Sequence, residues 1–155
     1  MKNNIGLDQK KSKELVDMLN DLLANYQMFY QNLRGFHWNI KGKNFFELHL
    51  KFEELYEDAV IKIDEIAERV LTLQGVPLHT FEDYLKQAEI DSFKQDKVGS
   101  ESVRIVIDNF STLIAKERAI LTKAGDAEDE GTASQMSDYI TETEKTLWML
   151  NAYMS

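Results

Sequence analysis

Four residues between positions 49 and 68 carry side chains that metal ions bind: His49, Glu53, Asp64 and Glu68. At about 100° per residue they lie at about 0°, 40°, 60° and 100° around a helix, so all four share one face. His49 with Glu53, and Asp64 with Glu68, are i,i+4 pairs, a spacing that brings two side chains together over one helical turn. Imidazole and carboxylate ligands together suit Fe(II), and oxygen ligands favour the Fe(III) that its oxidation produces. The pattern predicts that each pair holds one side of a metal ion.

The two pairs lie too far apart to share one ion within a subunit. Eleven residues of helix separate Glu53 from Asp64, which is about 16 Å along the axis. If two copies of the helix meet antiparallel across a two-fold axis, each pair faces the other pair of the neighbouring copy. Two equivalent sites would then form per dimer. A di-iron site inside one bundle would instead need Glu-x-x-His on two helices, and no Glu in this sequence has His three residues later.

A simpler interpretation is that these acids form a solvated helix face. Against it, they lie close to an apolar stripe containing Phe52 and Ala59, where unpaired carboxylates are costly and a metal would resolve the cost. His37, twelve residues before His49, is a candidate second imidazole, although a lone histidine in a connector is often a surface residue. His79 has no carboxylate at ligand spacing, so we expect a surface residue there.

The elements that must position these residues are helices. A single proline and seven glycines leave long uninterrupted stretches, and apolar residues recur at spacings of three and four. We expect helices over about 8–34, from 45 to the break at 75–77, over 80–88, from about 100 to 125, and from about 132 to 153. Ser100 and Thr132 are the predicted N-caps of the last two, and a break is expected around 35–43.

This order of elements predicts an all-α fold, a ferritin-like four-helix bundle with a long crossover between its second and third long helices that contains a short helix. The 155 residues are enough for a single domain, with residues 1–8 expected to form a flexible N-terminal tail. No apolar run approaches the roughly 18 residues of a membrane span, and the first residues do not resemble a secretory signal. We therefore expect a cytoplasmic protein.

Charge and cysteine usage limit the chemistry further. Cysteine is absent, which excludes thiolate ligands and nucleophiles, so a metal must use His and carboxylates. The formal net charge of −9 favours attraction of cations and disfavours a surface that coats nucleic acid.

The sequence resembles the Dps family, the DNA-binding proteins of starved bacteria. The resemblance rests on two blocks and the residues between and after them: His37-Trp38-Asn39-Ile40-Lys41-Gly42, Phe46, Leu48-His49, Phe52, Tyr56, Asp64-Glu65-Ile66-Ala67-Glu68-Arg69 and Thr146-Leu147-Trp148-Met149-Leu150. It implies a hollow homo-dodecamer with ferroxidase centres at its dimer interfaces. The implied ligands are His37, His49 and Glu53 of one subunit with Asp64 and Glu68 of its neighbour. The family usually has Asp where this sequence has Glu53. The extra methylene of Glu53 would change the position of the ion or weaken binding at the second metal position, and with it the stoichiometry and rate of iron oxidation.

The resemblance also implies a reaction. Hydrogen peroxide would be the preferred oxidant of Fe(II) and oxygen a slower one, and ferric mineral would be stored in the cage, protecting DNA and the cell from oxidative damage. In position, a set of acidic residues resembles those that line the family's three-fold pores; these are Asp126, Glu128, Asp129 and Glu130. Acids near a helix N-terminus equally suit its dipole.

Two competing functions remain open at this point. A structural DNA-compacting protein needs a mobile cationic tail or a basic surface. The basic start is short, and most of it is expected to lie in the first helical turns: Lys2, Lys10, Lys11 and Lys13. We therefore expect DNA binding to be weak at physiological salt. The second competitor is a ferritin-like bundle that binds metal without catalysing its oxidation, or one retained only as an adhesion or immunogenic surface. Glu53 is the feature that most favours impaired catalysis.

Overall fold

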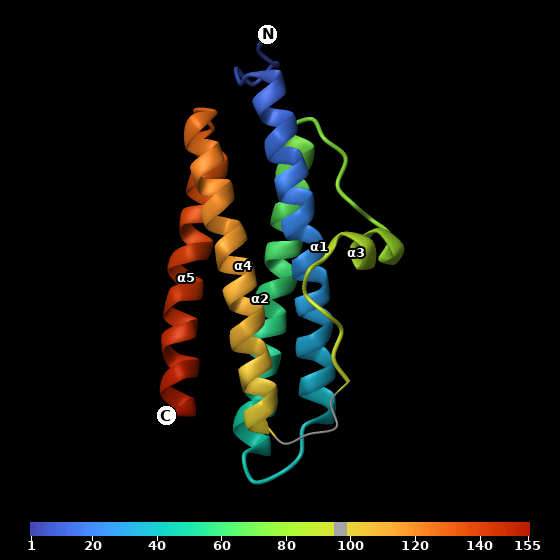
Figure 1. The fold of residues 1–155 in the computed structure, drawn as a ribbon, viewed down its shortest axis with the longest axis vertical. Helices are drawn as coiled ribbons and strands as arrows, with labels where there is room; N and C mark the ends of the chain where they lie inside the picture. Colours follow the sequence, from blue (N-terminus) through green and yellow to red (C-terminus); the bar gives the residue numbers. More distant parts are fainter. Residues whose placement is uncertain (95–98) are drawn as a thin grey trace.

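The computed structural model describes residues 1–94 and 99–155. Within these ranges the chain forms five helices and no β-strand, which confirms the predicted all-α class. The helices are α1 (Gln9–Asn39), α2 (Phe45–Thr72), α3 (Phe81–Gln87), α4 (Gly99–Asp126) and α5 (Glu130–Met154). The long helices lie side by side along one axis (Figure 1). Of the described helices, none is both long and apolar enough to cross a membrane.

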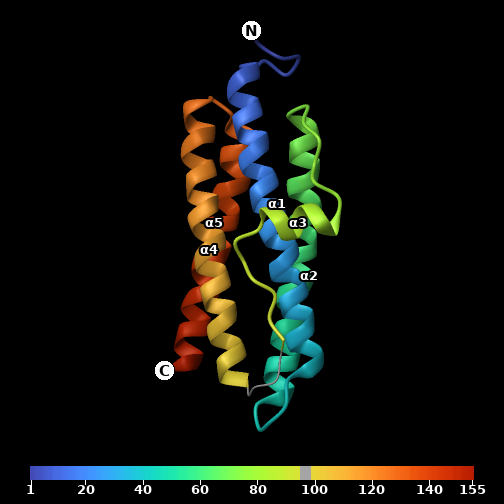
Figure 2. The same ribbon diagram turned by 45° about the vertical axis from the view of Figure 1, so that its right-hand side comes forward.

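The long helices form two antiparallel pairs, α1 with α2 and α4 with α5 (Figure 1). After α2 the chain returns along the bundle before α4 begins, so α2 and α4 run in the same direction (Figure 2). The short helix α3 lies on this return path, beside the middle of α1 (Figure 2). A bundle with one long crossover between its second and third long helices is the predicted ferritin-like arrangement.

The core is built from the apolar stripe that each long helix turns inward. The largest fully buried side chains are Tyr26, Phe29, Phe36, Phe52, Leu15, Leu19, Leu22, Leu23, Leu33, Ile66, Leu113 and Ile120. Burial of one such side chain contributes roughly 1.5–3 kcal/mol, so packing between helices outweighs the propensity of any single helix. Packing in the core therefore fixes how α2 is rotated about its own axis. This rotation determines which face of α2 remains available for metal-binding side chains.

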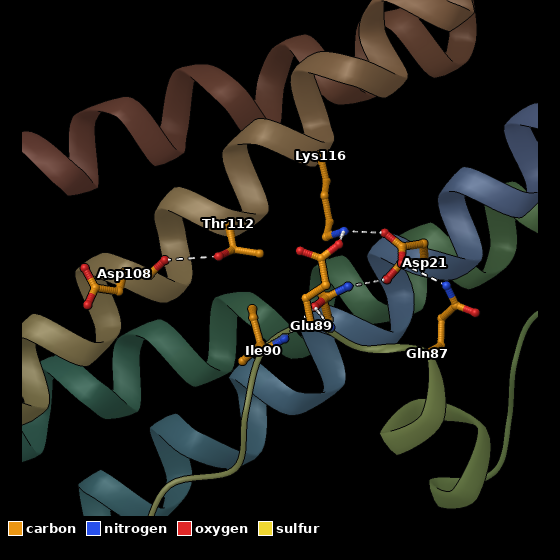
Figure 3. Close-up of polar contacts among 8 residues, drawn as sticks. Asp21, Gln87, Glu89, Ile90, Asp108, Thr112 and Lys116 are labelled. Carbon is orange, nitrogen blue, oxygen red and sulfur yellow. Dashed lines mark hydrogen bonds and ion pairs between the residues drawn. The ribbon is translucent and has the colours of Figure 1, made fainter.

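Polar bonds hold the crossover against the bundle. The Lys116 ammonium of α4 lies 2.7 Å from a carboxylate oxygen of Asp21 on α1 and 2.7 Å from one of Glu89 on the crossover (Figure 3). Gln87 donates to Asp21 at 2.9 Å, and the Asn25 side-chain oxygen accepts from the Glu89 backbone N–H at 2.9 Å. These side chains satisfy crossover groups that have no helical partner.

The sequence-based end of the first helix was wrong. α1 continues to Asn39, so His37 belongs to its last turn and not to a connector. Gly35 lies within the helix, and a side chain there would meet nothing within 4 Å, so this glycine marks no turn. The overlooked signal is that Phe36 and Ile40, both buried, continue the apolar period past Gly35.

The two predicted N-caps were also wrong. Ser100 lies inside α4, which begins at Gly99. α5 is capped by Asp129, whose side chain accepts from the Thr132 backbone N–H at 3.0 Å. The short helix over 80–88 is confirmed as α3, with Thr80 as its N-cap. Aspartate outranks threonine as an N-cap, which agrees with the observed choice.

Candidate metal centre

Two histidines contact each other through stacked rings and hydrogen bonds where α1 ends and α2 begins. Their rings stack with centroids 3.8 Å apart and an interplanar angle of 11°. The His37 Nδ1 lies 2.6 Å from the His49 backbone oxygen, and the His49 Nδ1 lies 2.7 Å from the His37 backbone oxygen. Because a carbonyl oxygen only accepts, each Nδ1 must carry the proton and donate. In the neutral imidazole with this tautomer, Nε2 carries the free lone pair through which a histidine binds a metal.

Glu53 completes the first half-site, one turn after His49 on α2. Its Oε1 lies 3.8 Å from the His37 Nε2, too far for a hydrogen bond. At that separation, the carboxylate oxygen and the imidazole nitrogen could both bind one metal ion lying between them, each at about 2 Å. The His37 side chain is 8% exposed and that of Glu53 is 41% exposed, so the half-site opens to the surface on the carboxylate side.

Aromatic rings fix the positions of the two imidazoles. Phe45 stacks on His49 with ring centroids 4.8 Å apart, and the edge of Tyr56 meets His37 at 5.4 Å. Both imidazoles therefore have little freedom to rotate, and the half-site is set before any ion arrives.

Asp64 and Glu68 form the second half-site further along α2, and both are exposed. A hydrogen bond with Asp64, together with that carboxylate's charge, raises the pKa of Glu68 above its ordinary value. The raised pKa reflects repulsion between two neighbouring carboxylates, and a divalent cation bound by both would relieve that repulsion.

The two half-sites stay apart within one subunit, as expected from their separation on one rigid helix. In the part of the chain that the structure describes, no three His, Asp or Glu side chains are grouped so that they could hold an ion. A complete site built from these residues therefore needs a second copy of the chain. His79, by contrast, is exposed, and its Nδ1 contacts the Pro77 carbonyl at 2.9 Å.

The acidic turn between α4 and α5 contains residues with different roles. Asp126, Glu128 and Glu130 are exposed. Asp129 is buried, caps α5 and pairs with the Arg69 guanidinium at 2.7 Å. Its carboxylate therefore already has partners within the subunit, whereas the three exposed acids are free to face a neighbour or a cation.

Two buried charged residues on α2 and α4 are not apparent from the sequence. Lys62 is 4% exposed and Glu117 is 0% exposed. Both flank apolar stripes, where a single charged residue normally reaches solvent with its long side chain. Only the tertiary packing shows that these two charged groups remain inside the bundle.

The bundle with its long crossover and the paired His and carboxylate groups on α2 define the class of ferritin-like proteins. A family model described as a ferritin-like domain matches residues 16–155. The crystal structure of a Dps protein from Vibrio cholerae O1, described as a member of a broad superfamily of ferritin-like diiron-carboxylate proteins, is similar with a TM-score of 0.97 and 54% identity. The similarity covers 99% of this chain and 97% of that one.

Curated proteins agree with this structural similarity. A protein from Porphyromonas gingivalis named DNA protection during starvation protein is 44% identical over 148 residues, which cover 96% of this chain and 93% of that protein. An uncharacterised protein from Haemophilus influenzae is 52% identical over 154 residues, covering 97% and 94%. This chain therefore belongs to the Dps family of ferritin-like proteins. Iron storage and protection of DNA under stress are the general functions of that family, and a homo-oligomer is its general form of assembly.

Proposed function

We propose that this protein is a ferroxidase and an iron-storage cage subunit, with each catalytic site shared between two subunits. The observation that carries the proposal is the reciprocal pairing of His37 and His49 through their Nδ1 atoms, which leaves the Nε2 atoms for a metal, that of His37 beside Glu53. One subunit supplies these three ligands, and Asp64 and Glu68 of its neighbour supply the rest. The donors fit iron, because imidazole suits Fe(II) and carboxylates favour the Fe(III) that results.

The dimer geometry follows from the single helix that carries both half-sites. When two copies of α2 pack antiparallel across a two-fold axis, the beginning of one lies opposite the end of the other. His49 and Glu53 then face the partner subunit's Asp64 and the partner subunit's Glu68. The operation produces two equivalent sites, and neither exists in an isolated subunit.

The reaction couples removal of Fe(II) to removal of an oxidant. Two ferrous ions each give one electron to hydrogen peroxide, the O–O bond breaks, and the two oxygens take up protons and leave as water. The protein holds the ions and leaves coordination positions open for the oxidant. Oxygen serves as a slower oxidant. Because hydrogen peroxide is consumed together with Fe(II), the pair that generates hydroxyl radicals is removed, which protects DNA and the cell.

We further propose a dodecameric cage, in the cytoplasm, that stores the ferric product as mineral. Twelve subunits at −9 each give a formal charge of −108, which concentrates cations around and inside the assembly. Asp126, Glu128 and Glu130, exposed at the α4–α5 turn, are the proposed pore residues through which Fe(II) enters. Asp129 contributes to such a pore by fixing the start of α5, because its carboxylate is bound to Arg69.

A DNA-compacting structural protein is the second candidate, favoured by the name of the Porphyromonas gingivalis relative. The basic residues near the start are few, and two of them have partners inside the subunit. Lys11 donates to the Asp126 backbone oxygen at 3.1 Å, and Lys13 pairs with Asp17 at 3.3 Å. We expect DNA retardation at low salt only, because purely electrostatic binding weakens steeply as salt rises.

The test of the proposed activity is anaerobic addition of Fe(II) to the assembled protein, followed by stoichiometric hydrogen peroxide. Ferric absorbance is followed in the wild type and in a His49→Ala, Asp64→Ala double variant. Rapid ferric formation in the wild type without radical release, lost in the variant, supports the ferroxidase. Equal, slow oxidation in both would leave a passive metal-binding or DNA-associated cage as the better function.

A further inference from the structure

The face of α2 that carries the candidate ligands also exposes large apolar side chains. Phe46 is 85% exposed near the start of the helix, and Leu71 is 57% exposed near its end. Leu50, Val60 and Ile61 between them are exposed too. At about 100° per residue, these five side chains lie in the same sector of the helix as the ligands. Apolar side chains gathered on one exposed face indicate a surface that another molecule covers.

The ligands are placed symmetrically about the middle of α2, which spans Phe45–Thr72. His49 is the fourth residue after the first, and Glu68 is the fourth before the last. Glu53 and Asp64 are likewise each eight positions from an end. Antiparallel packing across a two-fold axis brings together residues that are equally far from opposite ends. The proposed ligand pairs therefore set a register in which the two copies of α2 overlap along their whole length.

The same register places Phe46 opposite Leu71 of the partner subunit. Phe46 is the first residue after the start of α2, and Leu71 is the first before its end. This level lies three residues, about 4.5 Å, beyond His49 along the helix axis and away from the two-fold axis. Within the subunit, the Phe46 ring lies 5.4 Å from the ring of Phe45, which stacks on His49 at 4.8 Å. Ring contacts therefore connect Phe46 to the first half-site.

We propose that Phe46 of one subunit packs on Leu71 of the partner subunit, and that this apolar pair covers the outer end of each intersubunit metal centre. The inference rests on the proposed function, because the shared ligands set the register. An apolar cover limits the access of solvent to a metal site and lowers the local dielectric constant, which strengthens the attraction between ion and carboxylates. A bound ion therefore exchanges slowly with the solution and is held until the oxidant arrives.

The contact is tested by disulfide formation, because the chain has no cysteine of its own. A Phe46→Cys, Leu71→Cys variant, oxidised as the assembled protein, should give covalent dimers on a non-reducing gel. A disulfide requires Cα atoms within about 7 Å of each other. Phe46→Cys, Leu50→Cys is the matched control with two exposed cysteines on α2, and in the proposed dimer its cysteines on different subunits are about 25 Å or more apart. It should give no covalent dimer.

The cover is tested by the rate at which a chelator removes Zn²⁺ from the assembled protein. Phe46→Ala and Leu71→Ala should each speed release several-fold, whereas Phe46→Leu should stay near the wild-type rate because leucine still covers the ion. Ions bound elsewhere are identified by their release from a His49→Ala, Asp64→Ala variant. Phe81→Ala is the matched control, because Phe81 is an equally exposed phenylalanine on α3, at 82%.

The two measurements separate this inference from the proposed function, because neither uses iron oxidation. Covalent dimers and protected Zn²⁺ without ferric formation would support the apolar cover and overturn the ferroxidase. Ferric formation without covalent dimers in the assembled cysteine variant would overturn the apolar pair. Unchanged Zn²⁺ release from the alanine variants would make the pair an interface contact only and would also overturn the cover. If Phe46→Ala does not assemble, Leu71→Ala tests the same contact from the partner's side.

Discussion

His37 and His49 each donate from Nδ1 to the other's backbone carbonyl, at 2.6 and 2.7 Å, while their rings stack at 3.8 Å. The last turn of α1 and the beginning of α2 are thereby joined through the same two side chains that present their Nε2 atoms to a metal. The same two hydrogen bonds therefore orient the metal ligands and connect the end of α1 to the start of α2. Changing either ring should disturb both ligands.

We therefore expect His37→Ala to slow Fe(II) oxidation by at least about tenfold, since it removes one ligand and the ring that stacks on the other. The measurement is the initial rate of ferric absorbance after addition of hydrogen peroxide. His79→Ala, which changes an exposed histidine outside the site, should keep the wild-type rate. Equal rates in the two variants would argue against a catalytic role for His37.

Glu53→Asp should change how many ions the centre holds. The Glu53 Oε1 lies 3.8 Å from the His37 Nε2, and the shorter aspartate withdraws the carboxylate toward α2. We expect tighter binding of a second ion, detected as a higher Fe(II) stoichiometry in anaerobic titration calorimetry. Glu54→Asp, on the neighbouring residue that pairs with Lys51, should leave the isotherm unchanged. Superimposable isotherms for Glu53→Asp and wild type would show that the extra methylene is without effect.

Asp129→Ala should destabilise the subunit by about 3 kcal/mol, because it leaves a partly buried guanidinium unpaired and removes an N-cap. Arg69 donates to Asp129 at 2.7 Å and to Thr132 at 2.8 Å, and Gly131 leaves room for its guanidinium. The effect is measured as a lower thermal midpoint at matched subunit concentration. Asp126→Ala, at an exposed position, should shift the midpoint little; an equal shift would contradict the assigned role of Asp129.

The helices and the metal ligands differ in how well the sequence predicts them. Apolar periodicity predicts each long helix because burial of that stripe drives the packing. The shared face of His49 and Asp64 is also predictable, since both lie on one helix. The pairing of His37 with His49 could not be predicted, because it depends on how α1 and α2 meet. For the same reason nothing in the sequence indicates that Lys62 and Glu117 are both buried inside the bundle.

Glu117 should make stability depend on pH. Burial raises its pKa to about 8 from an ordinary value of 4.5, so the folded chain keeps a proton that the unfolded chain releases between these values. The free energy of unfolding should therefore fall as pH rises through this window, by as much as about 5 kcal/mol, and this contribution should then level off. Thermal midpoints between about pH 5 and pH 9 should fall more steeply for wild type than for Glu117→Gln. Parallel curves would contradict the raised pKa.

The sharing of one catalytic site by two subunits is tested most directly by mixing two inactive variants. His49→Ala subunits and Asp64→Ala subunits are unfolded together, reassembled, and assayed for ferric formation with hydrogen peroxide. Random pairing places an intact His49 opposite an intact partner Asp64 in about one quarter of the sites, so about one quarter of the wild-type rate should return. Each variant reassembled alone should stay inactive. If the mixture is no more active than the separate variants, although the two kinds of subunit have assembled together, the centre is not shared between subunits in this way.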